Sequence, residues 1–469
     1  MNREKTKTLI LAMLVIMSII FTQKIWFYSP INLLQSKDSF KQKQLTEIIE
    51  IRNQIVAPQR AVISFGNSYY TVVYSDIDKV WRKTKGILDH YFSRESEVQP
   101  TTHEKYKEIS RLKSIELEFG ENIPSALIAS VFDTMDNKIV SNIKEINKIL
   151  IPTLNRGVIY IVGEEENIYE VRLEGYQEDK QLLTFVDQIQ GSHYIKYYPL
   201  FIDVENYTVM PLSYQELTPQ VFVKSEIDVN NEQAVMETAK TFFDENLDFV
   251  KTIRETSGAI VFMYGYGEKG VRINNRGRLE YSEDIGSIAS TNVVAALDAA
   301  IDFVLKHGGF PEGTYLKEIR AQNKGYYFGF GYRIEGLPIV LNTSNMTHPI
   351  EIEVYGNKVK SYRTLIRAKM EFPNAFINNS MLLPQKIIED NISLLKSDYL
   401  LDTKEKEIKE EEVLSYIERN ITRAEIVYYD TLKDTEKHLI LPAWKIKINK
   451  RIYYFNGYDG KLLNSSLVN

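Results

Sequence analysis

The sequence contains no cysteine. This absence excludes disulfide bonds, thiol nucleophiles, iron–sulfur clusters and cysteine-ligated zinc in any compartment. Histidine is also scarce, and no two of the six histidines have a spacing typical of paired metal ligands. We therefore interpret them as surface or loop residues and expect no metal site and no cofactor. They are His90, His103, His193, His307, His348 and His438.

Positive charge is not in excess. The 469 residues include 57 Lys and Arg against 63 Asp and Glu, a formal charge of −6. The first 30 residues hold four basic side chains and one acidic one, so the remainder has 53 basic and 62 acidic side chains, a net charge of −9. Neutralising phosphates requires the opposite sign, so nucleic acid is not an expected partner.

Motifs for common catalytic sites are missing. The chain has no G-x-S-x-G, H-E-x-x-H, Walker lysine loop or EF-hand loop. The segment Gly265–Gly270 matches G-x-G-x-x-G, but a strand pattern follows it where a dinucleotide site needs a helix. We interpret it as a hairpin turn.

A second partial match is Ser393-Leu-Leu-Lys396, the S-x-x-K of penicillin-binding enzymes. The companion motifs S-D-N and K-T-G are absent, so an amphipathic helix explains this segment better. A glycosidase-like carboxylate pair could form in space, but the sequence gives no means of choosing it. The sequence therefore predicts no catalytic residue and no enzyme.

Only one long apolar run is present, near the start of "MNREKTKTLILAMLVIMSIIFTQKIWFYSP". Residues 8–28, from this run to the aromatic group at its end, would form a helix of about 31 Å, enough for one bilayer crossing. Basic residues precede it, which favours a cytoplasmic N-terminus at residues 1–7 and an extracytoplasmic bulk. The candidate membrane and partner contacts are Leu9, Ile10, Leu11, Leu14, Val15, Ile16, Ile19, Ile20, Phe21 and Trp26.

A cleaved signal peptide is the alternative interpretation of this run. The residues after Phe21 are bulky, whereas a signal peptidase requires small side chains. We therefore predict a retained anchor in the cell membrane.

The rest of the chain predicts an α+β fold, with mainly antiparallel sheets and packed helices. Aromatic residues make up 12% of the sequence, including 30 Tyr and 21 Phe, which is typical of sheet-rich proteins. The length favours several domains. We predict a juxtamembrane helix or stalk over 29–58 that ends at Pro58, an α+β domain over 59–211, a central α+β domain over 220–370, and a C-terminal α+β domain over 371–469.

Sequence patterns in this part of the chain predict two helices. In "STNVVAALDAAIDFVLKHGGFP", Ser290 or Thr291 is the expected N-cap, and Gly308 and Gly309 end the helix. The charged run in "LDTKEKEIKEEEVLSYIERN" predicts a solvated helix face.

The C-terminal stretch "LILPAWKIKINKRIYYFNGYDGKLL" alternates with period two. Trp444, Ile446 and Ile448 are expected to face a core, and Lys445 and Lys447 to face solvent. The proline at 442 indicates an edge strand or a strand start.

Together, the N-terminal anchor, the cysteine-free outer region and three segments resemble the YycH regulatory protein family. The segments are "ALDAAIDFVLKHGGFP", "YYFGFGYRIEGLPIV" and "LPAWKIKINKRIYYFNGYDGKLL". The resemblance spans nearly the whole chain and consists of packing and turn motifs. In that family the last two domains are similar to the ectodomain of the sister protein YycI, which corresponds here to about residue 220 onward.

The resemblance implies a membrane-anchored, non-catalytic regulator in a Gram-positive bacterium. It would act with a YycI-type partner on the sensor histidine kinase YycG, also called WalK, of the essential two-component system that governs cell-wall metabolism. Contacts between transmembrane helices would form a major part of the complex, so the lipid bilayer is an implied partner as well.

An alternative function stays open because the C-terminal segment is also similar to peptidase-propeptide-like (PepSY) modules. In that case the chain would be an extracytoplasmic sensor that binds peptide or glycan and has an inhibitory PepSY-like domain.

Overall fold

The structure is a computed structural model. It describes residues 7, 30–121, 123–154, 157–176, 180–192, 194–201, 208–211, 220–244, 247–287, 289–343, 346–370, 381–403, 407, 409–432 and 438–467. The chain divides into two compact units, Met1–Arg52 and Asn53–Asn469.

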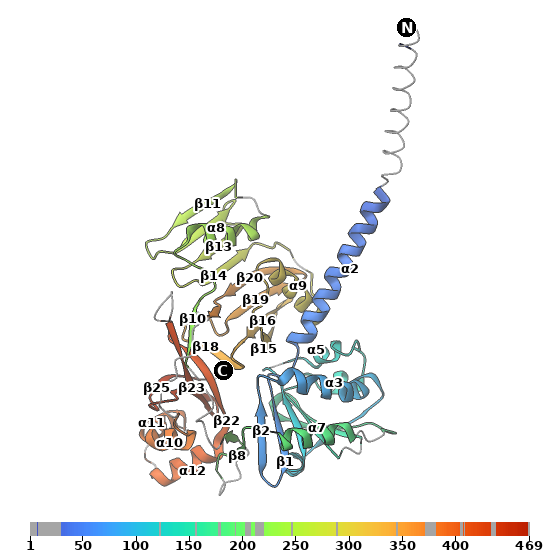
Figure 1. The fold of residues 1–469 in the computed structure, drawn as a ribbon, viewed down its shortest axis with the longest axis vertical. Helices are drawn as coiled ribbons and strands as arrows, with labels where there is room; N and C mark the ends of the chain where they lie inside the picture. The colour runs from blue at the N-terminus through green and yellow to red at the C-terminus, as the bar shows by residue number, and fades with distance from the viewer. Residues whose placement is uncertain are drawn as a thin grey trace. The chain divides into compact units, whose positions relative to one another are not determined.

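The described part of the first unit is mainly one helix, α2 (Pro30–Ile55), drawn in blue in Figure 1, whose last three residues already belong to the second unit. The sequence predicts a helix or stalk ending at Pro58, and α2 ends close to this proline. The residue before a proline disfavours helical backbone, which explains why the helix stops here.

The first sheet of the second unit has nine described strands in the order β3-β7-β6-β5-β4-β1-β2-β8-β9, all paired antiparallel. The strands are β1 (Arg60–Gly66), β2 (Tyr69–Val73), β3 (Glu97–Thr101), β4 (Ser114–Glu118), β5 (Lys148–Pro152), β6 (Val158–Val162), β7 (Ile168–Arg172), β8 (Tyr197–Pro199) and β9 (Val209–Pro211). The accompanying helices are α3 (Ile77–Ser93), α4 (His103–Ser110), α5 (Ser125–Ser130), α6 (Lys138–Asn142) and α7 (Lys180–Gly191).

One face of this sheet is a continuous apolar core. Ile115 and Leu117 on β4 and Ile149 on β5 are fully buried, because alternate residues of a strand point to the same face. Trp81 of α3 packs edge-on against Phe119, with ring centroids 5.9 Å apart. On the opposite face β4 carries Ser114, Glu116 and Glu118.

The second sheet has eight described strands in the order β11-β12-β13-β14-β20-β19-β16-β15. These are β11 (Val250–Arg254), β12 (Ile260–Tyr264), β13 (Lys269–Ile273), β14 (Leu279–Glu283), β15 (Tyr315–Gln322), β16 (Gly325–Gly331), β19 (Ile350–Tyr355) and β20 (Lys358–Thr364). The helices α8 (Glu232–Lys240) and α9 (Val293–Lys306) accompany it.

Helix α9 corrects one prediction. Its N-cap is Asn292, whose side-chain oxygen accepts from the Ala295 amide at 2.9 Å. The predicted caps Ser290 and Thr291 lie too early, since the chain enters the helix one residue later and asparagine caps as well as serine does. The predicted end is confirmed, because Gly308 and Gly309 follow with φ of 115° and 80°.

The third sheet combines strands from distant parts of the sequence. It follows the order β17-β18-β22-β23-β10-β21, and β24 and β25 extend it from β23. β18 and β22 pair in parallel. The strands are β10 (Val221–Ser225), β17 (Arg333–Ile334), β18 (Leu337–Leu341), β21 (Arg367–Lys369), β22 (Ile421–Asp430), β23 (His438–Ile448), β24 (Arg451–Asn456) and β25 (Leu462–Leu467).

Pro442 lies inside β23, a central strand, so the prediction of an edge strand or strand start is wrong. The reason is a change of partner along β23: its residues 438–440 pair with β10 and its residues 443–448 pair with β24. The proline, which has no N–H to donate, falls between these two segments. Its carbonyl still accepts from the Gly457 amide at 3.0 Å.

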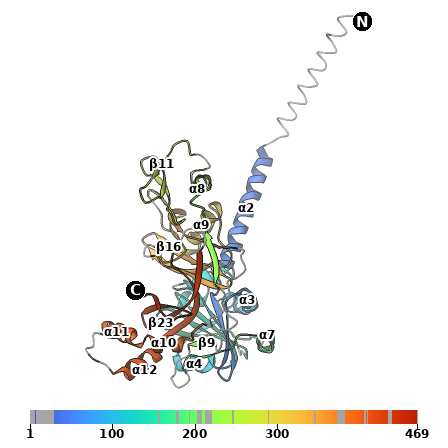
Figure 2. The ribbon, with the colours of Figure 1, turned by 60° about the vertical axis from the view of Figure 1, so that its left-hand side comes forward.

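Helices α10 (Pro384–Asp390), α11 (Ile392–Thr403) and α12 (Glu410–Asn420) lie beside this sheet in both views (Figures 1 and 2). The charged run predicted as one helix face is divided between the end of α11 and the start of α12. Residues 407 and 409, which are described between them, are not helical. Helices packed on mainly antiparallel sheets confirm the α+β class, while the domain bounds and the YycI-like character of residues 220 onward stay predictions.

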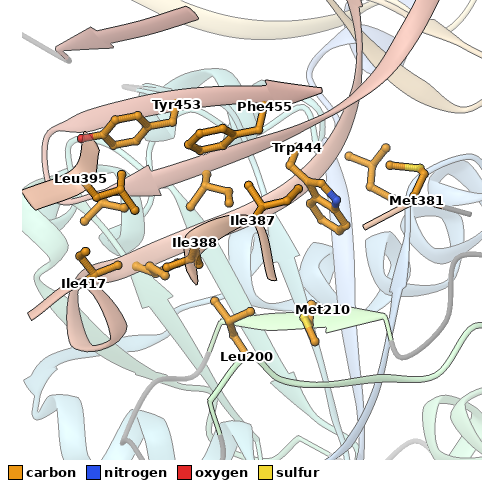
Figure 3. Close-up of a cluster of buried hydrophobic side chains, with 14 of the residues drawn as sticks. Leu200, Met210, Met381, Ile387, Ile388, Leu395, Ile417, Trp444, Tyr453 and Phe455 are labelled. Atoms are coloured by element: carbon orange, nitrogen blue, oxygen red, sulfur yellow. The ribbon is translucent and has the colours of Figure 1, made fainter. Parts of the chain in front are cut away.

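The core of this part of the fold forms around Trp444. Trp444 and Phe455 are fully buried, and the indole nitrogen of Trp444 donates to the Leu382 carbonyl at 2.9 Å. Figure 3 shows Ile387 beside Trp444, and Met210 of β9 on the side of the cluster opposite Tyr453 and Phe455. The predicted inward face of the C-terminal stretch is therefore confirmed.

Candidate functional site

The polar face of the first sheet places charged side chains directly beside one another. Arg60 on β1 lies opposite Glu118 on β4, and Lys148 on β5 lies on the other side of Glu118. Two hydrogen bonds join Arg60 to Glu118, from Nε to Oε2 at 2.6 Å and from Nη2 to Oε1 at 3.1 Å. Lys148 Nζ lies 3.3 Å from Glu118 and 3.0 Å from Glu116. The register of three strands thus fixes an ionic group in which Arg60 and Glu118 are buried and Lys148 is partly exposed.

Strands β22 and β23 add a second group of charges to it. Glu425 accepts from Lys445 at 2.8 Å and pairs with Arg423 at 2.8 Å. Arg423 also lies 3.7 Å from Glu118, and Arg60 lies 3.9 Å from Glu425. We call these residues, together with Glu116 and Lys148, the charge network. Lys445 was expected in solvent, and that prediction is wrong because the polar face of β23 is covered by the network.

The network stays ionised because its charges are paired. Burial alone would raise the pKa of the Glu118 carboxyl, but Arg60, Lys148 and Arg423 hold that pKa well below its usual value. Burial opposes ionisation of Glu425 in the same way, and Arg423, Lys445 and Arg60 outweigh it, so its pKa is also lowered.

A cleft of about 470 Å³ borders the network on the polar face of the first sheet. Leu150 and Val162 contribute apolar wall, while His103 of α4 and Arg419 of α12 lie at its exposed margin. The Tyr106 hydroxyl donates to Glu116 at 2.6 Å inside it. The combination suits a ligand with an apolar body and a polar or charged end.

The serines of the cleft do not show a nucleophile-and-base arrangement. Ser64, Ser110 and Ser114 each donate a side-chain hydrogen bond to a backbone carbonyl. A hydroxyl activated for attack would instead donate to a base. Among the described residues, no group of three or more His, Asp or Glu side chains is placed to hold a metal ion.

The motifs singled out in the sequence have structural roles. Gly265–Gly270 spans the turn between β12 and β13, where Tyr264 pairs with Lys269, which confirms the hairpin. Ser393 and Lys396 lie on α11, which confirms the helix.

Three histidines make close contacts in the structure. His307 and His348 lie in loop segments, as predicted, whereas His438 lies in strand β23, which contradicts the prediction. His307 stacks on Phe242 with centroids 4.2 Å apart, next to the end of α9. His348 is buried with its Nε2 2.7 Å from Glu318, and burial lowers its pKa although Glu318 opposes this shift. His90 and His103 are exposed as predicted, and His193 lies outside the described residues.

The third of these histidines belongs to a buried group that sequence reasoning missed. His438 lies 2.9 Å from Asp430, and Arg367 donates to Asp430 at 2.7 Å, with both charged side chains fully buried. Burial raises the pKa of the Asp430 carboxyl, but His438 and Arg367 lower it by more. The pKa of Asp430 is therefore below its usual value. The sequence offers one signal for this buried group, which is the acid Asp430 at the end of the apolar run of β22.

The predicted anchor contacts, from Leu9 to Trp26, lie outside the described residues. Within the part of the chain that the structure describes, no helix is both long and apolar enough for a bilayer crossing. The membrane helix over 8–28 therefore stays a prediction.

Comparison with known proteins gives a family match at the N-terminal end. The family model for the YycH protein, N-terminal domain, matches residues 4–184. No curated protein matches the chain.

Among solved structures, the chain is similar to the crystal structure of YycH from Bacillus subtilis, with a TM-score of 0.51 and 12% identity, over 87% of this chain and 95% of that one. At this identity the likeness shows the fold alone. Two weaker matches are an uncharacterized protein from Eubacterium rectale (TM-score 0.36, 13% identity, 53% of this chain and 86% of that one) and the YpeB C-terminal domain of Bacillus megaterium (0.25, 11%, 51% and 98%).

Proposed function

We propose that the chain is a membrane-anchored, non-catalytic regulator of the YycG/WalK sensor histidine kinase. The chain belongs to the YycH family, because residues 4–184 match the model of that family's N-terminal domain. This family match is the observation on which the proposal rests. The fold likeness to YycH from Bacillus subtilis agrees with it.

In this proposal a helix over residues 8–28 crosses the membrane once, and the bulk of the chain lies outside the cytoplasm. The helix contacts the transmembrane helices of the kinase and of a YycI-type partner. The apolar run supports the crossing, and the basic residues before it support its direction. Leu9, Leu14, Ile16, Ile19 and Phe21 are among the side chains that would make these contacts.

A chimera tests the proposal. Residues 8–28 are replaced by an unrelated membrane span of equal length, and kinase autophosphorylation is measured in vesicles containing the kinase, the YycI-type partner and either chain. We expect the effect of the natural chain on the kinase to disappear in the chimera. Circular dichroism checks that the region from residue 53 onward keeps its fold. Unchanged kinase control by a folded chimera would contradict the proposal.

The cleft beside the charge network favours a second candidate function, a sensor that binds peptide. A labelled tetrapeptide with a free carboxylate would place apolar side chains against Val162 and its carboxylate near Arg419. Thr422→Trp, at the exposed margin of the cleft, narrows the entrance without changing the core. We expect at least about tenfold weaker binding by this variant in fluorescence titration. Equal binding by both proteins would argue against this function.

A further inference from the structure

An open hollow of about 810 Å³ lies at one end of strands β11–β14 in the second sheet. Its apolar side consists of three aromatic rings, from Phe243, Phe249 and Tyr264. Phe249 is 79% exposed and Tyr264 is 44% exposed. Removing aromatic rings from water is energetically favourable. Rings as exposed as these therefore indicate a surface to which another molecule can bind.

The charges around the hollow have mostly one sign. Asp244, Glu268, Glu283 and Asp284 contribute four carboxylates, and Lys269 contributes the one cation among its lining residues, 3.8 Å from Glu283. The lining therefore has a net charge of −3. Aromatic faces beside carboxylates attract ammonium and guanidinium groups, because the ring quadrupole and the acids both favour a cation.

The adjoining strand has an unused edge. β11 is the last strand of the described second sheet, and Lys251, Thr252, Ile253 and Arg254 on it are all exposed. Phe249 directly precedes β11, so the edge begins at the hollow. An exposed edge strand offers backbone N–H and C=O groups to an extended segment of another chain.

From these features we propose that the hollow and the edge of β11 bind an extended, basic segment of a partner protein. Its backbone pairs with β11, and a lysine or arginine side chain enters the hollow against Phe249. Ile253 and Tyr266, 45% and 101% exposed, lie beyond the hollow and enlarge the apolar surface past what a small cation can cover.

Charge disfavours a second copy of this chain as the occupant. The chain has a formal charge of −6, so two copies repel one another at an acidic surface. The proposed contact is separate from the anchor and does not depend on the proposed kinase regulation.

The test uses the full chain in nonionic micelles and a fluorescein-labelled octapeptide of alternating lysine and valine, with binding followed by anisotropy. The site variant combines Asp244→Asn, Glu268→Gln and Asp284→Asn. The matched control combines Glu108→Gln, Glu389→Gln and Glu411→Gln, three exposed acids outside the hollow that change the net charge equally. We expect at least about tenfold weaker binding by the site variant and unchanged binding by the control.

The aromatic contribution is tested at Phe249, whose exposure makes substitution safe for folding. Phe249→Ala is expected to weaken the peptide several-fold, and Phe249→Trp to retain binding because the larger ring still faces the cation. Binding should also weaken with added salt. These results together would support the proposal.

Other outcomes overturn it. Equal weakening in the site and control variants would mean that only net charge matters. Equal binding of an octapeptide of alternating glutamate and valine would exclude a cation site. Displacement of the peptide by spermidine at equal cation concentration, without sensitivity to Phe249→Ala, would mean a small-cation site only. Self-association that the site variant abolishes, without peptide binding, would make a second copy the occupant.

Discussion

The pair of strands β22 and β23 has two faces of opposite character. On one face Ile426 lies opposite Trp444, and they are 7% and 0% exposed. On the other face Glu425 lies opposite Lys445, and they form an ion pair at 2.8 Å. Other parts of the chain cover both faces, but a different kind of interaction stabilises each of them.

The apolar face is stabilised by removing hydrocarbon from water, and its contacts are non-directional. The charged face must first offset the cost of taking ions out of water, so each charge depends on its partners. We therefore expect a smaller side chain to reduce stability most on the apolar face. On the charged face, we expect removal of a single charged partner to reduce stability.

The largest expected effect is on the apolar face. Trp444→Ala should lower the free energy of unfolding by about 4 kcal/mol, because it leaves a cavity and an unpaired Leu382 carbonyl. Urea unfolding followed by circular dichroism measures it. Leu467→Ala, at a side chain 59% exposed on β25, serves as the control and should change stability by less than about 0.5 kcal/mol. Similar losses in both variants would contradict the assignment of the core.

Removal of one charge should have the next largest effect. Glu425→Gln should cost about 3 kcal/mol in the same measurement, because Lys445 and Arg423, which are only partly exposed, lose the carboxylate nearest to them. The comparison predicts a rescue: combining Glu425→Leu with Arg423→Met and Lys445→Met should recover at least half of the loss. A triple variant as unstable as the single one would show that the two faces do not differ in this way.

The charged face should also respond to acid. Glu118 and Glu425 have folded pKa values below the usual 4.5, so the unfolded chain binds more protons as the pH falls. Their stabilisation is complete above about pH 5 and is lost toward lower pH, by up to about 1.4 kcal/mol per pH unit for each group. Urea unfolding between pH 6 and 3 should show a shallower decline for Glu425→Gln than for the natural chain. Parallel declines would contradict the ionised network.

The smallest expected effect is at Lys317, a half-buried lysine on β15. Burial, together with Lys445, lowers its pKa to about 8, although Glu121 and Glu425 oppose this. The unfolded chain binds more protons between pH 8 and 10.5, so the lysine destabilises the fold at neutral pH and less so at alkaline pH. Lys317→Met should therefore raise the unfolding free energy at pH 7 by about 1 kcal/mol. The difference from the natural chain should shrink by pH 10, and a constant difference would contradict the lowered pKa.

Much of the local structure could be predicted from patterns within a few residues. The alternation around Trp444 identified its buried face, the glycines at 308 and 309 identified the end of α9, and the strand after Gly265–Gly270 identified a hairpin. Each of these depends on backbone geometry or a period that neighbouring residues share.

The candidate site could not be predicted in the same way. The sequence shows Lys445 on a polar face but not what covers that face. His438 and Asp430 are close along the chain, yet their partner Arg367 comes from another strand. Pro442 indicated an edge because the sequence does not show that β23 changes partner at that residue.

By itself, the sequence determined the α+β class, the exclusion of cysteine chemistry and the resemblance to the YycH family, since these depend on composition and on local order. Only the tertiary structure decided that Arg60 and Glu118 meet Arg423 and Glu425 in a buried charge network. The physical reason is distance along the chain: an ion pair between residues separated by more than 300 positions leaves no periodic signal near either of them.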